Sequence, residues 1–368
     1  MKICLLEPYY TGSHQSWANG YAAHSRHQVR LLTLPGRFWK WRMHGGAVSL
    51  ARQFMALPDT PELLLATDML DLTTFLALTR RRTAGIPTAI YFHENQLTYP
   101  WSPTDRDISR QRDKHYGFIN YASALAADAV FFNSQYHRDS FLQALPRLLK
   151  HFPDFNELES VRQIEAKSRV LPLGLNLGRF DAVQPKAPQP RRVPLVLWNH
   201  RWEYDKNPAD FFEALKRVAA QGLEFEVALL GENFSRQPAE FLQARAWLGQ
   251  RVVQFGYADS FADYAQWLWR ADLLPVTSNQ DFFGASVIQA IYCGCVPLLP
   301  RRLAYPELLP PALHQPYFYD DFEGLVARLA AALADITPLR REALRNAAAR
   351  FDWQVLAPTY DEMVEALI

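Results

Sequence analysis

Two cationic side chains stand five residues apart just after an apolar segment, a spacing suited to holding phosphate groups. Residues 195–208 read LVLWNHRWEYDKNP, so Arg201 and Lys206 follow the apolar run LVLW. A short run of large apolar residues bounded by polar ones is typical of a buried strand. Parallel α/β sheets bind ligands beyond the carboxyl ends of their strands. We therefore predict that Arg201 and Lys206, with Asn199 beside them, lie at a ligand-binding edge.

A polar loop followed by the start of a helix lies farther along the chain. Residues 273–300 read LLPVTSNQDFFGASVIQAIYCGCVPLLP, which indicates a strand, a loop, a helix that starts at Gly284 and ends at Gly294, and a second strand. The first N–H groups of a helix lack partners within it, and the helix dipole favours negative charge there. We predict that the amides of Ala285 and Ser286 bind a pyrophosphate together with the two cations.

Polar residues also follow three apolar segments of the N-terminal half. They are Gly12, Ser13 and His14 beyond KICLLEP, His93, Glu94 and Asn95 after TAIYF, and Asn133 and Ser134 after AVFF. The carboxyl ends of neighbouring parallel strands meet at one edge of a sheet, where such folds place their ligands. We predict that the first group cradles one substrate, that His93 contacts substrate, and that the others orient it or line the site of a second substrate.

The segment from Arg37 to Arg42 interleaves cations with aromatic rings. It reads RFWKWR, with Trp39, Lys40 and Trp41 at its centre. This composition suits contacts with phosphates and stacking on unpaired bases of a nucleic acid. The alternative is a loop whose tryptophans pack beneath the domain. We predict that Arg37, Trp39, Lys40, Trp41 and Arg42 contact a nucleic acid.

Strand and helix patterns alternate through both halves of the chain, which predicts an α/β fold with parallel sheets. The expected strands are KICLLEP, QVRLLTLP, LLLATDM, TAIYFHE, DAVFFNS and SRVLPLGLN in the first half, then PLVLWNH, FEVALLGE, RVVQFGY, ADLLPVTS and CVPLLP. The stretch AVQPKAPQPRR carries three prolines and no large hydrophobe, so it is expected to be an extended linker. We predict two Rossmann-like domains facing each other across a cleft, residues 1–181 and 193–352, joined by residues 182–192.

The composition is that of a well-filled globular protein. The 368 residues are 49% hydrophobic and 13% aromatic, and the net charge is +1. No apolar run reaches the roughly 18 residues that a membrane span needs, and the first residues lack the features of a signal peptide. The three cysteines, Cys4, Cys293 and Cys295, cannot form a disulfide framework. We expect a soluble cytoplasmic protein that does not bind membranes.

Several motifs resemble those of retaining GT-B glycosyltransferases, in the order that those enzymes show. RVLPLGLNLGRF resembles the end of their N-terminal domain, WNHRWEYDKNP their phosphate-binding Arg and Lys, and NQDFFGASVIQA their paired-glutamate motif around a glycine. FDW at residues 351–353 resembles the start of their last helix. The resemblance implies a nucleotide-sugar donor bound by the second domain, and residues 353–368 packing back on the first.

A narrower resemblance is to the tRNA-queuosine mannosyltransferase family. It rests on EPYYTGSHQSW, TLPGRFWKWR, YFHENQLTYP, VFFNSQYHRDSF and WNHRWEYDKNP, together with the FFG…YCGC run that includes Phe283. The resemblance implies transfer of mannose from GDP-mannose to the cyclopentenediol of queuosine in a tRNA anticodon. It also implies that His93 contacts the donor sugar, and that Gly12, Ser13 and His14 lie on the donor side. Glu94, Asn95, Asn133 and Ser134 then fall on the acceptor side.

The chain departs from the family at its paired acids, which fall here on Asp281 and Gln289. In the family the first acid hydrogen-bonds sugar hydroxyls and the second binds the ribose diol. The shorter Asp281 retains the charge, whereas the Gln289 amide accepts a hydrogen bond without it. The identities of the nucleotide and of the sugar are therefore open.

Residues 105–114 form a second charged segment of mixed sign, which is typical of a solvated face. Arg106, Arg110, Arg112 and Lys114 alternate there with aspartates. Asp105 and Asp107 also form a D-x-D, the metal signature of a different glycosyltransferase fold, but no strand pattern precedes them. We predict no metal and no resident cofactor.

The resemblance implies that transfer retains the anomeric configuration. The leaving phosphate oxygen, held by Arg201, Lys206 and the Ala285 amide, would accept the proton of the attacking hydroxyl. Two alternatives remain: a related enzyme with a lipid or small-molecule acceptor, and a tRNA-binding protein that has lost turnover.

Overall fold

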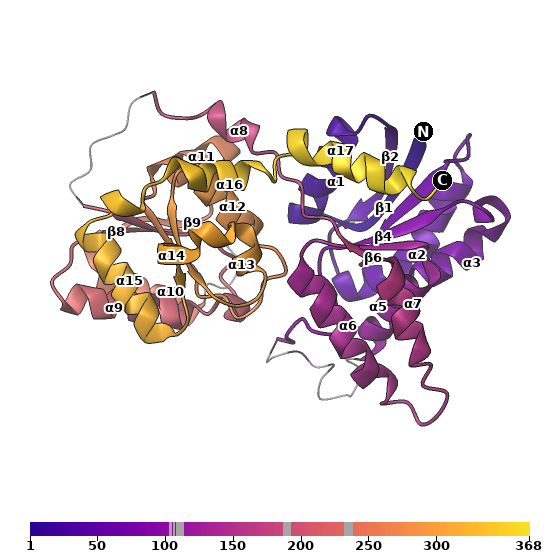
Figure 1. Cartoon of the computed structure of the whole chain (residues 1–368), viewed down its shortest axis with the longest axis horizontal. Helices are drawn as coiled ribbons and strands as arrows, with labels where there is room; N and C mark the ends of the chain where they lie inside the picture. Colours follow the sequence, from indigo (N-terminus) through magenta and orange to yellow (C-terminus); the bar gives the residue numbers. More distant parts are fainter. Residues whose placement is uncertain (103–104, 106, 108–113, 187–192, 232–237) are drawn as a thin grey trace. The chain divides into compact units, whose positions relative to one another are not determined.

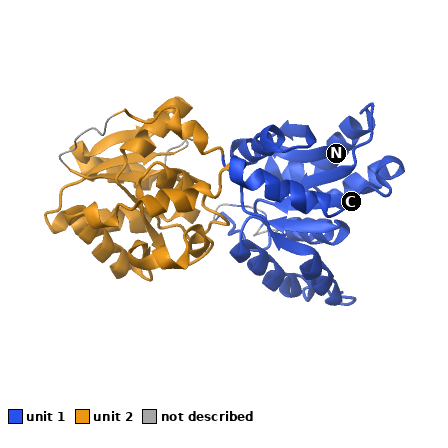
Figure 2. Ribbon diagram, turned by 45° about the horizontal axis from the view of Figure 1, so that its top comes forward, with its two compact units in different colours: residues 1–175, 353–368 blue, residues 176–352 orange. Residues whose placement is uncertain are grey.

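The computed structural model describes residues 1–102, 105, 107, 114–186, 193–231 and 238–368. These residues form two compact units (Figure 2): unit 1 comprises residues 1–175 and 353–368, and unit 2 comprises residues 176–352. Each unit contains a six-stranded sheet with helices packed against it (Figure 1). The strand pairs of both sheets are parallel.

The sheet of unit 1 has the strand order β2-β1-β3-β4-β5-β6. Its strands are β1 (Lys2–Tyr10), β2 (Gln28–Pro35), β3 (Leu63–Thr67), β4 (Thr88–Phe92), β5 (Ala129–Phe132) and β6 (Ser168–Val170). Its helices are α1 (Gly12–His24), α2 (Trp39–Met55), α3 (Leu72–Thr83), α5 (Lys114–Ala126), α6 (Gln135–Leu149), α7 (Glu159–Lys167) and α17 (Trp353–Glu365). Every residue of β3, β4 and β5 is buried, as expected of strands covered by helices on both faces.

The sheet of unit 2 has the strand order β12-β11-β10-β7-β8-β9. Its strands are β7 (Leu195–Trp198), β8 (Glu226–Leu230), β9 (Val252–Gly256), β10 (Leu273–Pro275), β11 (Val296–Pro300) and β12 (Phe318–Tyr319). Its longer helices are α9 (Pro208–Ala220), α10 (Ala239–Leu248), α11 (Phe261–Arg270), α12 (Ala285–Tyr292), α15 (Phe322–Ala334) and α16 (Glu342–Ala349). Its short helical turns are α8 (Gly178–Asp181), η1 (Tyr204–Lys206), η2 (Gly249–Arg251), α13 (Tyr305–Leu308), η3 (Pro311–Leu313), α14 (His314–Tyr317) and η4 (Thr337–Leu339).

The last helix of the chain packs on the first helix of unit 1. In Figure 1 the yellow α17 lies beside the indigo α1, although more than 300 residues separate them in sequence. The fully buried Trp353 indole occupies the space that a Cβ atom on Gly20 or Gly174 would fill, so α17 approaches the unit closely only because both positions are glycine. Asp361, also buried, accepts hydrogen bonds from the Tyr21 hydroxyl, the Ser25 hydroxyl and the backbone N–H of Arg26.

The α/β fold expected from the sequence is confirmed, and each expected strand segment contains an observed strand. The additional strand β12 has two residues, too few for a periodic pattern. The boundary between the two units falls in the sequence between Leu175 and Asn176, whereas we predicted from the sequence that the first domain ends at Asp181. Residues after Leu175 go with unit 2 because Phe180 packs edge-on against Phe261 and its carbonyl accepts a hydrogen bond from the Trp269 indole. Of the expected linker, residues 187–192 lie outside the described residues.

Candidate functional site

Lys206 lies in a network of oxygen atoms at the carboxyl edge of the unit 2 sheet. It ends the turn η1 that follows β7, and its side chain is almost fully buried. The ammonium donates to the carbonyl oxygen of Gln280 at 2.7 Å and lies 3.3 Å from Asp205 and 3.4 Å from Asp281. The loop after β7 and the loop before α12 are thereby joined through one cation.

Arg201 stands beside this network and is half-exposed. Its guanidinium lies 3.3 Å from Glu203 and 3.9 Å from the buried Asp205. The sequence predicted two cations facing free amides. The structure adds that the carboxylates of Glu203, Asp205 and Asp281 neighbour these cations.

Asp281 is held as a carboxylate. Burial alone would raise the pKa of Asp281, but the charge of Lys206, with His200, the Phe283 amide and the Tyr305 hydroxyl, lowers it below the ordinary value. The Tyr305 hydroxyl donates to one carboxylate oxygen at 3.1 Å, and the N–H of Phe283 donates to the other at 3.3 Å. This orientation fixes an anionic hydrogen-bond acceptor at the site.

Among the described residues, no side chain caps the start of α12. Gly284 is the N-cap with φ +101°, a left-handed conformation that favours glycine. A Cβ atom there would meet Leu308 at 3.1 Å. The first amides of the helix, those of Ala285 and Ser286, therefore have no capping partner from a side chain.

Asn199 and the neighbouring His200 tie the end of β7 to this helix. Asn199 donates to the carbonyl of Ser286 at 2.8 Å, and His200 Nδ1 lies 3.3 Å from the Ser286 hydroxyl. Burial, and then the charge of Lys206, lowers the pKa of His200 to about 3, so this ring is neutral. The predicted donor-side residue Asn199, directly after β7, thus contacts Ser286 in the first turn of α12.

Gln289 faces α11 and is held there by a tyrosine. Its side-chain oxygen accepts a hydrogen bond from the Tyr264 hydroxyl at 2.8 Å. The oxygen can accept a second hydrogen bond, and the amide N–H groups of Gln289 can donate. Phe283, the last of the predicted donor-side residues, is buried with its ring edge-on to Phe351.

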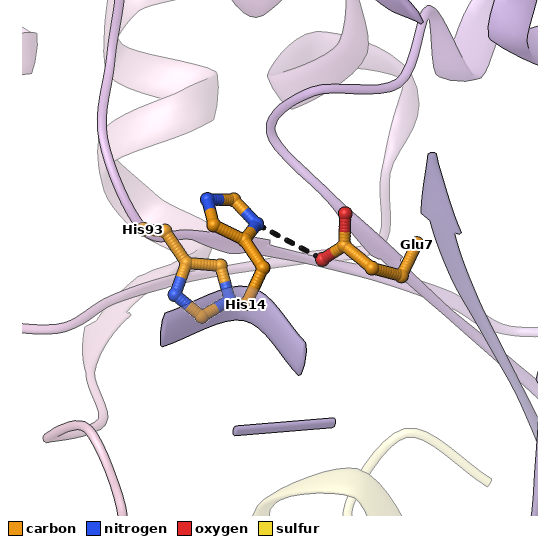
Figure 3. A group of neighbouring side chains, drawn as sticks. All are labelled: Glu7, His14 and His93. Carbon is orange, nitrogen blue, oxygen red and sulfur yellow. Dashed lines mark hydrogen bonds and ion pairs between the residues drawn. The ribbon is translucent and has the colours of Figure 1, made fainter. Parts of the chain in front are cut away.

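The corresponding edge of unit 1 contains a buried ion pair. Glu7, near the end of β1, is fully buried, and its Oε2 lies 3.0 Å from His14 Nδ1 in the first turn of α1 (Figure 3). Burial would lower the pKa of His14, but the charge and hydrogen bond of Glu7, with Asp68 and Glu94, raise it to about 9. His14 is therefore an imidazolium at neutral pH.

His93 follows β4, and its ring lies against that of His14 with the centroids 4.1 Å apart and the planes tilted by 36°. Burial first, and then the charges of His14 and His137, lower the pKa of His93 well below its ordinary value. Its backbone is held from both ends, since its N–H donates to Asp68 at 2.8 Å and its carbonyl accepts from Asn133 at 2.9 Å. His93 Nε2 is buried without a hydrogen-bond partner among the described residues.

Three other predicted residues of this edge differ in their exposure and in their hydrogen bonds. Gly12, with φ +50° and open space around its Cα, and the exposed Ser13 begin α1, whose N-cap Thr11 makes no side-chain cap. Glu94 is half-buried and accepts a hydrogen bond from Gln96.

Three predicted acceptor-side residues make structural hydrogen bonds. The Asn95 side-chain oxygen closes a turn by accepting from the N–H groups of Leu97 and Thr98. Asn133 bridges His93 and His137, and the Ser134 hydroxyl caps α6. These contacts account for the polar residues at this strand end without a ligand.

The segment from Arg37 to Arg42 is split by the start of α2. Trp39 packs against Trp101 and Tyr116, and Lys40 lies among these three rings while its ammonium pairs with Asp105 and Asp107. Asp105 and Asp107, the two acids of the D-x-D, are thus partners of a lysine.

Most of the remaining residues of this segment are exposed to solvent. Trp41 is 64% exposed and Phe38, in the left-handed region at φ +55°, is 78% exposed. Arg37 is exposed, whereas Arg42 donates to the carbonyl of Pro35. Arg106, Arg110 and Arg112 of the second charged segment lie outside the described residues.

Among the described residues, one group of side chains could share a metal ion: Glu7, His14 and His93, whose ligand atoms lie within 4.8 Å of one another. His14 Nδ1 already contacts Glu7 at 3.0 Å, and the planes of the two imidazoles are tilted by 36°. This geometry fits an ion pair better, and the absence of a metal stays a prediction.

Comparison with known proteins identifies the family. The model of the tRNA-queuosine alpha-mannosyltransferase N-terminal domain matches residues 2–175, nearly the whole N-terminal part of unit 1. A tRNA-queuosine alpha-mannosyltransferase of Drosophila melanogaster is 34% identical over 315 residues, which cover 84% of this chain and 81% of that protein. The chain belongs to the tRNA-queuosine alpha-mannosyltransferase family.

Solved structures similar to this family member are glycosyltransferases of the GT-B fold. Sucrose-phosphate synthase of Thermosynechococcus elongatus matches with a TM-score of 0.70 at 17% identity, over 100% of this chain and 99% of that chain. Anabaena HepE in complex with UDP matches with a TM-score of 0.67 at 16% identity, over the full length of both. The GT-B fold expected from the sequence is confirmed, and this family member is a glycosyltransferase. No helix within the described ranges is long and apolar enough to cross a membrane.

Sequence reasoning missed several residues that complete the two edges of this glycosyltransferase. Glu7 and Asp68 in unit 1, and Tyr264 and Tyr305 in unit 2, each hydrogen-bond a predicted site residue. Asp68 directly follows β3 in the motif LLLATD, so the strand-end rule that selected His93 could also have selected it. Glu7 lies within the strand and the two tyrosines on other segments, so no local signal marks them.

Proposed function

We propose that this chain is a retaining glycosyltransferase that transfers mannose from GDP-mannose to the cyclopentenediol of queuosine in a tRNA anticodon. The observation that carries the proposal is the cluster of Arg201, Lys206 and Asp281 at the uncapped start of α12, in a chain related to a tRNA-queuosine alpha-mannosyltransferase. We further propose that the reaction takes place in the cytoplasm and requires no resident metal.

The donor diphosphate would be bound by the unit 2 edge. Arg201 and Lys206 supply positive charge, and the amides of Ala285 and Ser286 supply directed hydrogen bonds. A diphosphate between them would exchange the carboxylate partners of the two cations for phosphate oxygens. Such preorganised donors stabilise the negative charge that develops as the sugar–phosphate bond breaks.

Asp281 and Gln289 would contact the sugar and the ribose of the donor. Asp281, oriented by Tyr305, accepts hydrogen bonds from sugar hydroxyls. Gln289, whose oxygen accepts from Tyr264, would hydrogen-bond the ribose diol through its amide group. The absence of a charge at residue 289 is compatible with either a guanine or a uracil nucleotide.

The transfer step needs no strong side-chain base. The bond between the anomeric carbon and the phosphate oxygen breaks, and a queuosine hydroxyl forms the new bond on the same face of the sugar. The proton of that hydroxyl passes to the leaving phosphate oxygen. His93, neutral and with Nε2 free of partners in the described part of the chain, would hydrogen-bond the sugar during this step.

The test is to incubate the purified chain with queuosine-containing tRNA and a panel of GDP- and UDP-sugars, and to weigh the released nucleosides by mass spectrometry. We expect a hexose on queuosine with GDP-mannose, and we expect it to persist after dialysis against EDTA. Arg201→Ala should abolish it. Arg217→Ala is the matched control, because Arg217 is equally exposed in unit 2 but pairs with Glu323 instead. Nucleotide binding without hexose addition from any donor would overturn the assignment.

A further inference from the structure

Glu7 is buried in a position where both of its carboxylate oxygens have a partner. Its Oε1 accepts from the N–H of Tyr9 at 2.7 Å, and its Oε2 contacts His14 Nδ1 at 3.0 Å. Two contacts fix the rotation of the carboxylate. They also fix the proton of His14 on Nδ1 and hence the orientation of the imidazole.

The protonation state of His14 depends on the groups around it. The titratable groups that act on it are Glu7 at the end of β1, Asp68 after β3, and Glu94 and His93 after β4. The three acids favour the protonated ring, and burial opposes it. Glu7 is the acid in direct contact, so the charge of His14 depends chiefly on that one side chain.

The charge of His14 acts on the ring next to it. Figure 3 shows Glu7, His14 and His93 together, and the centroids of the two imidazoles are 4.1 Å apart. One cation at this distance disfavours a second. Burial is the first cause that keeps His93 neutral, and the charge of His14 adds to it. A neutral imidazole offers one nitrogen as a donor and one as an acceptor, whereas an imidazolium only donates.

Burying an ion pair has an unfavourable desolvation free energy. Removing two charges from water usually offsets what their attraction returns, so an apolar pair of similar size would serve a purely structural role as well or better. The pair here lies beside a histidine whose Nε2 has no partner among the described residues.

We propose that Glu7 is a positioning residue for sugar transfer: it holds His14 as an imidazolium against His93, and so orients His93 toward a substrate hydroxyl and reinforces the neutral state that burial favours. This inference rests on the proposed function, which gives His93 its contact with the sugar. Glu7 itself is not required to touch substrate.

The first test follows the histidine rings by NMR in the full chain, without substrate. In the wild-type chain we expect His14 to titrate near pH 9 and His93 to remain neutral at neutral pH. In Glu7→Gln, which keeps the shape and removes the charge, the pKa of His14 should fall below the ordinary 6.5, because burial is then less opposed. His14→Asn identifies the His14 signal. A wild-type His14 that titrates near 6.5, or one unaffected by the substitution, would overturn the proposal.

The second test measures transfer by Glu7→Gln as a function of pH. We expect kcat to fall by roughly 10- to 100-fold, in the range seen when the partner that orients a functional histidine is removed, while KM for tRNA stays the same. Glu7→Asp, which restores a carboxylate, should recover part of the loss. Glu159→Gln, exposed on α7, is the control for a lost surface charge.

The outcomes separate this inference from the function on which it rests. Wild-type kcat and an unchanged pH profile in a folded Glu7→Gln chain would sink the positioning role even if hexose transfer is confirmed. If the wild-type chain transfers no hexose to queuosine, the proposed function fails. The titration then still decides whether Glu7 sets the charges of His14 and His93.

Discussion

At the scale of single residues, the site is a set of charges held in place by neighbours of opposite sign. Lys206 contacts Asp205 and Asp281, and Arg201 contacts Glu203. In the proposed donor site, these contacts would hold the cations in place before a substrate arrives.

Replacing Lys206 tests this arrangement most directly. Lys206→Met removes the cation and keeps the aliphatic chain, so we expect kcat to fall by about 100-fold or more, as for loss of one transition-state donor. The pKa of Asp281 should rise, since burial is no longer opposed by the charge of Lys206. Steady-state kinetics against pH measures both effects. Lys216→Met, on the exposed side of α9, should behave as wild type.

At the scale of elements, the starts and ends of helices decide which side chains are available. The first turn of α2 buries one side of the segment, so that Trp39 and Lys40 pack inward while Trp41 faces solvent. The prediction that all five residues contact RNA therefore divides into two groups. Lys40 already has two carboxylate partners, and the exposed Trp41 is the better candidate for stacking on a base.

We expect Trp41→Ala to weaken binding of tRNA by roughly 5- to 100-fold, the range that loss of one stacked base usually produces, without changing the melting temperature. Trp39→Ala should instead lower the melting temperature, because it removes a ring packed against Trp101 and Tyr116. Val48→Ala, exposed on the same helix, is the control. Filter binding and thermal melting separate the two effects. Equal affinities of wild type and Trp41→Ala would contradict the stacking role.

A buried carboxylate of α17, that of Asp361, contributes to holding this helix in unit 1. Asp361→Ala leaves the Tyr21 hydroxyl, the Ser25 hydroxyl and the Arg26 N–H without their acceptor. We expect a loss of about 2–4 kcal/mol in the free energy of unfolding of unit 1, since unsatisfied buried donors each cost desolvation energy. Urea unfolding measures it. Glu362→Ala changes the exposed neighbour and should have little effect; equal urea midpoints for the two variants would show that the carboxylate does not fasten α17.

At the scale of the whole molecule, the stability should depend on pH through His14. Its pKa is raised from 6.5 to about 9 in the folded state. The stabilising contribution is therefore fully present below pH 6.5 and is lost as the pH rises through about 9. Such a rise corresponds to roughly 3 kcal/mol at most.

Urea unfolding between pH 6 and pH 10, followed by a probe in unit 1, measures this dependence. We expect the wild-type midpoint to fall across that interval and the midpoint of Glu7→Gln to change less. Parallel curves for the two chains would show that the ion pair does not govern the pH dependence.

The sequence by itself determined the alternating strands and helices, the placement of Arg201, Lys206 and Gly284 at strand and helix ends, and the family. These features follow from local periodicity and from short motifs, which can be read within ten to twenty residues. The roles of His93 and of the donor-side residues rest on the same motifs and stay predictions.

Tertiary structure alone decided which charged and aromatic side chains meet. Separate elements are joined by the contacts of Glu7 with His14 and of Lys40 with Asp105 and Asp107. They are also joined by the ring contact of His14 with His93 and by the hydrogen bond from Tyr264 to Gln289. Such pairs depend on strand order and helix packing. Local propensity carries no information about them, because the free energy of a charge is set by what surrounds it once it is buried.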